Sequence, residues 1–163
     1  MAKTVGEVMT AKPLTVHPET PIKEAIMLLA DNRISGLPVV DEANQIVGVL
    51  SEADLMWQTT GATLPPYVVV LDSVIYLTNP AHYNQELHKA LGQTVAEVMT
   101  AKAITIPPDQ SLRHAAQLMH DKQVRRLIVV DEANRTLGVL TRGDIVREMA
   151  SRYADDTEPA EVV

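Results

Sequence analysis

The sequence VGEVMTAK at residues 5–12 returns as VAEVMTAK at residues 95–102, and this repetition organises the rest of the chain. Two further motifs recur at the same offset of 90 residues: VVDEAN at residues 39–44 and 129–134, and GVLSEAD at residues 48–54, which becomes GVLTRGD at residues 138–144. Residues 5–56 therefore align with residues 95–146 without a gap, and 23 of the 52 positions are identical. Two copies are too few for a solenoid, so the repeat predicts a pair of similar units that share an interface.

Capping patterns mark where the helices of each copy begin. Thr4 and Glu7 have the spacing of a capping box, which predicts a short helical turn, and Thr94 and Glu97 repeat it. Thr20 is then predicted to cap a longer helix with Pro21 at its first position. The apolar side chains of this helix recur at helical spacing. They are Ile22, Ala25, Ile26, Leu29 and Ala30, matched after Ser111 by Leu112, Ala115, Ala116 and Met119.

Each copy is also predicted to contain three strands. The segments LTV (residues 14–16) and ITI (residues 104–106) are short strand candidates. LPVV and IVGVL, joined by the turn-forming DEAN, predict a hairpin in the first copy. Ser51 and Thr141 then begin a second helix in their copies. The predicted fold class is therefore α/β (α+β), with two β-α-β-β-α repeats packed as a pseudo-twofold pair.

The predicted domains are residues 4–57 and 94–150, with an ordered linker at residues 58–93 and a frayed tail at residues 154–163. Within the linker, YVVVLDSVIYL is ambiguous, because its β-branched residues favour a strand while the spacing of its apolar residues favours a helix. The helix is preferred. The apolar residues at helical spacing are Leu64, Val68, Leu71 and Ile75. A further helix is predicted from Asn79 as N-cap and Pro80 as first residue to Gly92 as its stop.

The composition excludes several classes of function. The chain has 163 residues, a net charge of −7 and no cysteine, which excludes disulfides, thiolate metal sites and cysteine nucleophiles. An acidic chain is a poor candidate for nucleic-acid binding, and no apolar run approaches the roughly 18 residues of a membrane span. The sequence MAKTVGEVMT has no apolar signal region, so we expect a cytoplasmic protein. The scattered histidines predict no metal site, and no P-loop or nucleophile-elbow motif is present.

The order of these motifs resembles a pair of cystathionine-β-synthase (CBS) domains, also called a Bateman module. The resemblance rests on VMT at the start of each copy, NRISGLPVVD, VRRLIVVD, and the closing GVLSEADL and GVLTRGDI, and it covers residues 4–57 and 94–150. The chain also resembles the small stand-alone CBS-pair proteins. The resemblance implies an adenosine ligand, namely AMP, ADP or ATP and sometimes S-adenosylmethionine or a dinucleotide. It further implies two clefts between the paired domains and a homodimer in which two pairs form a flat disc.

The closing motif Gly-x-x-Ser/Thr-x-x-Asp offers chemistry that suits a nucleotide. A carboxylate, here Asp54 or Asp144, can accept hydrogen bonds from both hydroxyls of a ribose diol. The hydroxyl of Ser51 or Thr141, at a helix start, can bind phosphate. The same spacing is that of a capping box, in which both side chains would serve only the helix terminus.

Two arginines stand before an apolar strand of the second copy. A planar guanidinium at Arg125 or Arg126 is a natural partner for phosphate, although charged residues also protect exposed strand ends. The aligned positions of the first copy are Ser35 and Gly36, which carry no charge.

The resemblance implies which residues line each cleft, with the base wall from one copy and the ribose and phosphate groups from the other. The better cleft has Asp144 on the ribose and Thr141 with an arginine on the phosphate. Its residues are Asp144, Thr141, Val139, Arg125, Arg126, Ile34, Ser35 and Leu14. The second cleft lacks a basic phosphate group of its own. Its residues are Asp54, Ser51, Val49, Ile104 and Val124.

The leading hypothesis is a non-catalytic sensor of adenine nucleotides, without metal or catalytic cofactor, that acts through the conformation of an oligomer or of a protein partner. The alternative is a structural protein for dimerisation or partner docking, whose clefts are vestigial. The uncharged first-copy position and Ile128 in place of Pro38 favour that alternative. An enzyme is a third hypothesis, and no motif of the sequence supports it.

Overall fold

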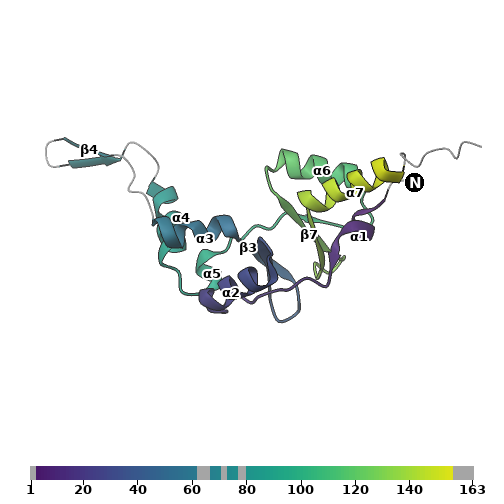
Figure 1. The fold of residues 1–163 in the computed structure, drawn as a ribbon. Coiled ribbons are helices and arrows are strands. Elements are labelled where there is room, and N and C mark those ends of the chain that lie inside the picture. The colour runs from purple at the N-terminus through teal and green to yellow at the C-terminus, as the bar shows by residue number, and fades with distance from the viewer. Residues whose placement is uncertain (1–2, 62–66, 71–72, 77–79, 156–163) are drawn as a thin grey trace, which may run out of the picture. The chain divides into compact units, whose positions relative to one another are not determined.

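The computed structural model describes residues 3–61, 67–70, 73–76 and 80–155, which divide into two compact units (Figure 1). Unit 1 comprises Met1–Leu14, Ala43–Ile46 and Ala103–Val163, and unit 2 comprises Thr15–Glu42 and Val47–Lys102. The units differ from the sequence repeats, because each contains the opening segment of the other repeat.

Unit 1 is a mixed sheet with the strand order β1-β8-β7-β6, flanked by helices. Strands β1 (Thr10–Ala11), β8 (Thr136–Thr141) and β7 (Arg126–Val130) pair antiparallel, and β6 (Thr105–Ile106) pairs parallel with β7. Helices α6 (Leu112–Asp121) and α7 (Arg142–Asp155) lie side by side in Figure 1. The short helix α1 (Val5–Val8) packs against both α7 and β8.

Unit 2 repeats this arrangement with single bridges in place of the two outer strands. Strands β2 (Gly36–Val40) and β3 (Ile46–Ser51) form the predicted hairpin. Val16 bridges β2 at Val39, and Thr100 bridges β3 at Val49. The strand predicted at residues 14–16 is therefore reduced to one bridge. Helices α2 (Ile22–Asn32), α3 (Glu52–Thr60) and α5 (Val95–Val98) complete this part of the unit.

The exchange of opening segments follows from where their apolar side chains are buried. Val95 and Val98 of the second repeat are fully buried in the core of unit 2, with Leu37 and Leu50. Val5 of the first repeat is fully buried in the core of unit 1. Burying a valine side chain stabilises a fold by about 1.5–3 kcal/mol, so each opening turn helps to hold together the unit built mainly by the other repeat.

The motif glycines Gly48 and Gly138 let the VMT segments cross a neighbouring strand. A Cβ at Gly138 would overlap the Met9 side chain and lie 2.9 Å from the Thr10 carbonyl oxygen. A Cβ at Gly48 would lie 2.6 Å from Met99 Sδ and 2.9 Å from the Thr100 carbonyl oxygen. The glycine of the closing motif is therefore needed for packing.

The linker contains a helix and a hairpin. Helix α4 (Pro80–Leu91) begins at Pro80 as predicted and packs on α3, while the predicted N-cap Asn79 lies outside the described residues. For the described part of YVVVLDSVIYL the preferred helix is wrong, because β4 (Tyr67–Val70) and β5 (Ser73–Tyr76) pair antiparallel, while Leu64 and Leu71 of the predicted stripe lie outside the described residues. The dense β-branched and aromatic residues of this segment favour extended backbone over a helix.

The helix starts confirm most of the capping predictions. Capping boxes form at Thr4 and Thr94, and Ser111 Oγ accepts a hydrogen bond from the His114 N–H. Thr20 is not the N-cap of α2, because Pro21 takes that position and Thr20 Oγ1 accepts a hydrogen bond from the His17 N–H instead. Helix α7 continues through Asp155, and the rest of the predicted tail lies outside the described residues.

Within the helical stripes, Ile22, Ala25 and Leu29 are buried as predicted, whereas Ile26 and Ala30 are exposed. None of the helices in the described ranges is long and apolar enough to cross a membrane.

Candidate functional site

The closing motif of each repeat forms the start of a helix around a buried aspartate. In unit 1, the Thr141 N–H and Oγ1 both donate to Asp144 Oδ2, each at 2.7 Å. In unit 2, the Ser51 N–H and Oγ donate to Asp54 Oδ2 at 2.9 and 3.0 Å. The Asp144 N–H donates back to Thr141 Oγ1 at 3.2 Å, and Ser51 and Asp54 form the same reciprocal pair. Both motifs are therefore capping boxes, which was one of the two interpretations of their spacing. One carboxylate oxygen of each aspartate, Oδ1, takes no part in the cap.

The remaining oxygens of the two aspartates have different surroundings. Asp144 Oδ1 accepts from Arg147, whose side chain is 74% exposed on the next turn of the same helix. Asp54 Oδ1 accepts from Lys89 of α4 and from Thr100 Oγ1, the latter at 3.1 Å. Because a carboxylate offers about four acceptor positions, the two aspartates differ in the number of positions that remain open to a ligand.

The fold brings Arg126 next to the motif of unit 1. Arg126 is the cross-strand partner of Thr141, and Val139 is the partner of Ile128 two positions further along the same strands. The Arg142 N–H donates to the Arg125 carbonyl at 3.1 Å, which places both arginines beside the start of α7. Unit 2 repeats this bond between the Glu52 N–H and the Ser35 carbonyl, also at 3.1 Å, but without a cationic side chain.

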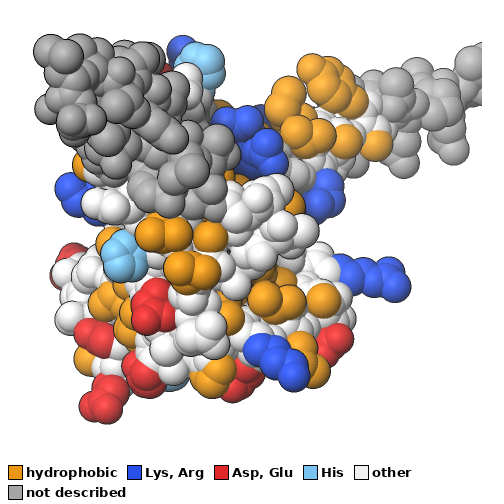
Figure 2. Space-filling model, turned by 90° about the vertical axis from the view of Figure 1, so that its left-hand side faces the viewer, with side chains coloured by type: hydrophobic (Ala, Val, Ile, Leu, Met, Phe, Trp, Pro, Cys, Tyr) orange, Lys and Arg blue, Asp and Glu red, His pale blue; other side chains and the backbone are white. Residues whose placement is uncertain are grey.

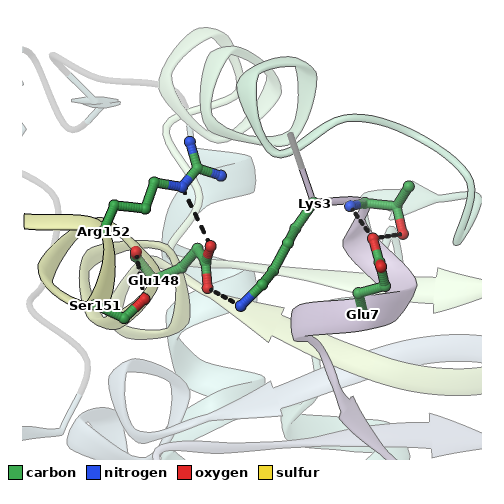
Figure 3. Close-up of polar contacts among 6 residues, drawn as sticks. Lys3, Glu7, Glu148, Ser151 and Arg152 are labelled. Carbon is green, nitrogen blue, oxygen red and sulfur yellow. Dashed lines mark hydrogen bonds and ion pairs between the residues drawn. The ribbon is translucent and has the colours of Figure 1, made fainter. Parts of the chain in front are cut away.

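A pocket of about 340 Å³ opens beside Asp144 between α1 and α7. Figure 3 shows the polar contacts at its rim, where Lys3 reaches Glu148. The lining residues are Lys3, Glu7, Val8, Asp144, Arg147, Glu148 and Ser151. Sequence reasoning missed this pocket, although Asp144, Glu148 and Ser151 have the spacing of one helical face.

Glu148 holds the N-terminal segment to α7. Its carboxylate accepts from Lys3 Nζ at 2.7 Å and from Arg152 Nε at 3.2 Å (Figure 3). The hydrogen bond from Lys3 lowers the pKa of Glu148 below its ordinary value of 4.5, and Arg152 adds to this effect while burial opposes it. Hydrogen bonds from the backbone and side chain of Thr4 likewise lower the pKa of Glu7. Both carboxylates are therefore charged at neutral pH.

The residues predicted for each cleft are divided between the two units. For the better cleft, Asp144, Thr141, Val139, Arg125, Arg126 and Leu14 belong to unit 1, while Ile34 and Ser35 belong to unit 2. For the second cleft, Asp54, Ser51 and Val49 belong to unit 2, while Ile104 and Val124 belong to unit 1. The residues predicted to bind the ribose and the phosphate lie within one unit for each motif, and these roles stay predictions, as do the base walls.

Comparison with known proteins gives the family. The sequence model of the CBS domain family matches residues 5–58 and again residues 95–151, which together make up most of the chain. The chain belongs to the CBS domain family. The predicted resemblance and the mixed α/β fold class are thereby confirmed.

Among CBS proteins, the chain is similar to the chloroplastic CBS domain-containing protein CBSX1 of Arabidopsis thaliana. The two are 35% identical over 150 residues, which cover 88% of this chain and 63% of CBSX1, so the chain spans less than two thirds of that relative.

Two solved CBS structures are also similar. CBSX2 in complex with AMP has a TM-score of 0.77 and 30% identity, covering 91% of this chain and 97% of CBSX2. The CBS domain pair of protein MJ0100, in complex with 5′-methylthioadenosine and S-adenosyl-L-methionine, has a TM-score of 0.67 and 25% identity. The match covers 90% of this chain and 99% of that pair. The three ligands bound in these relatives share an adenosine moiety.

Proposed function

We propose that the chain is a non-catalytic regulatory module that binds an adenosine-derived ligand, with an adenine nucleotide such as AMP, ADP or ATP as the regulatory molecule. The observation that carries this proposal is the buried carboxylate of Asp144, which retains acceptor capacity after the helix cap is made. A ribose presents two adjacent hydroxyl donors, and a carboxylate without donors of its own suits them.

The phosphate of the ligand would lie against Thr141 and Arg126, which the β7–β8 pairing makes neighbours. A guanidinium can bind phosphate through two parallel hydrogen bonds, and the Thr141 hydroxyl can add a third by turning its proton from Asp144 Oδ2 to the phosphate. The similarity to AMP-bound CBSX2 supports this assignment.

Titration calorimetry with AMP, ADP, ATP and S-adenosylmethionine tests the proposal. We expect at least one of these ligands to bind with a dissociation constant in the micromolar range and to lose about tenfold or more of its affinity in Asp144→Ala. No binding of any of the four to the folded protein would contradict the proposed function. A turnover assay with the bound ligand tests the non-catalytic assignment, since release of product would overturn it.

We further propose that the module is a cytoplasmic homodimer that signals to a protein partner through its conformation. Several large apolar side chains lie exposed, and Figure 2 shows such side chains among charged ones on one face of the molecule. On α7, Val146, Met149 and Tyr153 are all more than half exposed and recur at the spacing of one helical face. Light scattering should give the mass of a dimer, and Met149→Glu should shift it toward a monomer. A monomer mass for the wild type at all concentrations, with and without nucleotide, would contradict the dimer.

The structural alternative keeps one specific observation in its favour. The carboxylate of Asp54 is fully engaged by partners from its own unit, as expected of a site that serves only the fold. If the same were true of both motifs in solution, the protein would dimerise without binding any of the four ligands.

A further inference from the structure

Helix α4 belongs to the linker and has no counterpart in the other repeat, yet it contacts the motif of unit 2. The ammonium group of Lys89 donates to Asp54 Oδ1, and it also lies 3.3 Å from Thr100 Oγ1. Thr100 itself donates to the same Asp54 oxygen. A linker residue thus occupies the carboxylate that the motif would otherwise present to a ligand.

The hydrogen bonds of the two aspartates can be counted against what a carboxylate can accept. Asp54 accepts four: two from Ser51 and one each from Lys89 and Thr100. Within the described ranges, Asp144 accepts three, two from Thr141 and one from Arg147. Since a carboxylate offers about four lone-pair positions, Asp54 is saturated and Asp144 is not.

The two cations also differ in how firmly they are held. The Lys89 side chain is only 22% exposed, whereas that of Arg147 is 74% exposed. Gln58 of α3 donates to the carbonyls of Lys89 and Gly92, which ties the end of α4 to α3. Gly92 is buried, and a Cβ there would lie 2.6 Å from Val98 Cγ2, so the chain after α4 packs closely against α5. Lys89 is therefore anchored from several sides.

We propose that Lys89 determines which of the two motif aspartates can take a ribose diol: it closes Asp54, so that Asp144 alone binds a diol in the wild-type protein. This inference rests on the proposed function and adds selection between the two motifs to it. A ligand at Asp54 would have to displace a charge-assisted hydrogen bond from a partly buried lysine, whereas a ligand at Asp144 finds an acceptor position open. Displacing such a bond weakens binding by about tenfold or more.

Adenosine is the probe for the test, because it carries the diol without a phosphate charge. Calorimetry of the wild type is expected to give one adenosine per chain. Asp54→Asn should leave its affinity within about twofold, whereas Asp144→Asn should weaken it by about tenfold or more. This comparison keeps Lys89 in place and so does not depend on how well a lysine variant folds.

Lys89→Met should then bind two adenosines per chain, one at Asp144 and one at Asp54. The double variant Lys89→Met, Asp144→Asn should bind one, at Asp54. His88→Met, at an exposed neighbouring position of α4, serves as the matched control and should keep the wild-type stoichiometry. Two adenosines per wild-type chain, or equal losses in Asp54→Asn and Asp144→Asn, would overturn the selection by Lys89 and leave the proposed function standing. A loss of AMP but not of adenosine in Lys89→Met would overturn it too, since Lys89 would then bind phosphate. If neither the wild type nor any variant binds adenosine, the selection by Lys89 is overturned, and if none of AMP, ADP, ATP and S-adenosylmethionine binds either, the proposed function itself fails.

Discussion

Replacing Gly138 by alanine should destabilise unit 1, because strand β1 crosses β8 at this residue. The added Cβ would overlap the Met9 side chain and lie 2.9 Å from the Thr10 carbonyl oxygen. The methionine can rotate away, but the carbonyl belongs to a backbone segment fixed by the β1–β8 pairing and by the 3.1 Å bond from the Lys12 N–H to the Leu137 carbonyl. Overpacking of this kind costs about 1–3 kcal/mol.

The chain offers a matched control in Gly143, which the first repeat replaces by Ala53. A Cβ at Gly143 would meet nothing closer than Arg147 Nη1, at 3.5 Å, and the residue lies within helix α7. Alanine is a better helix former than glycine, so Gly143→Ala should stabilise the protein by up to about 1 kcal/mol. The two substitutions add the same methyl group and should act in opposite directions.

Urea denaturation, monitored by far-ultraviolet circular dichroism, measures both effects. A change in the midpoint of the transition at unchanged slope reports a change in stability. Gly48→Ala extends the test to unit 2, where the single tryptophan, Trp57, lies in α3 and reports unfolding by fluorescence. A midpoint for Gly138→Ala that equals or exceeds that of the wild type would refute the close approach of β1.

Two further predictions concern the charges of unit 1. Replacing Arg125 and Arg126 by Ser and Gly, the residues at the matching first-repeat positions, should weaken AMP binding while changing adenosine binding little; an unchanged ratio of the two affinities would show that the arginines do not bind phosphate. Lys3→Met should lower the stability of the protein above pH 4.5, because the lowered pKa of Glu148 in the folded state stabilises the fold there, and this contribution is lost as the pH falls below 4.5. Urea midpoints of the wild type and Lys3→Met should therefore converge on acidification, and a constant difference between them would contradict the role of the Lys3–Glu148 bond.

The repeat predicted local structure well because its signals are local. Capping residues, helical stripes and the hairpin around DEAN depend on residues a few positions apart, and the structure confirms the capping boxes at Thr4 and Thr94 and the hairpin of β2 and β3. Thr20 differs from Ser111, because Pro21 follows it and takes the N-cap position itself. The segment of β4 and β5 was mispredicted as a helix because its apolar residues fit the spacing of a helix as well as that of a strand. Its many β-branched residues favour the strands that the structure shows.

The exchange of opening segments could not be predicted from the sequence, because both repeats bury the same valines in the same way. Val5 and Val95 stand at equivalent positions, and nothing in either motif states which core receives them. The partners of the aspartates were missed for a similar reason. Lys89 reaches Asp54 across 35 residues through the packing of α4 on α3, and no local spacing signals such a contact.

Binding of the ribose diol by Asp144 can be tested by removing the diol from the ligand and the carboxylate from the protein in one thermodynamic cycle. Calorimetry would compare adenosine with 2′,3′-dideoxyadenosine on the wild type and on Asp144→Ala, with circular dichroism to verify that the variant is folded. We expect the wild type to prefer adenosine by about tenfold or more and this preference nearly to disappear in Asp144→Ala. The same preference in both proteins would contradict the claim and return Asp144 to the cap of α7 alone.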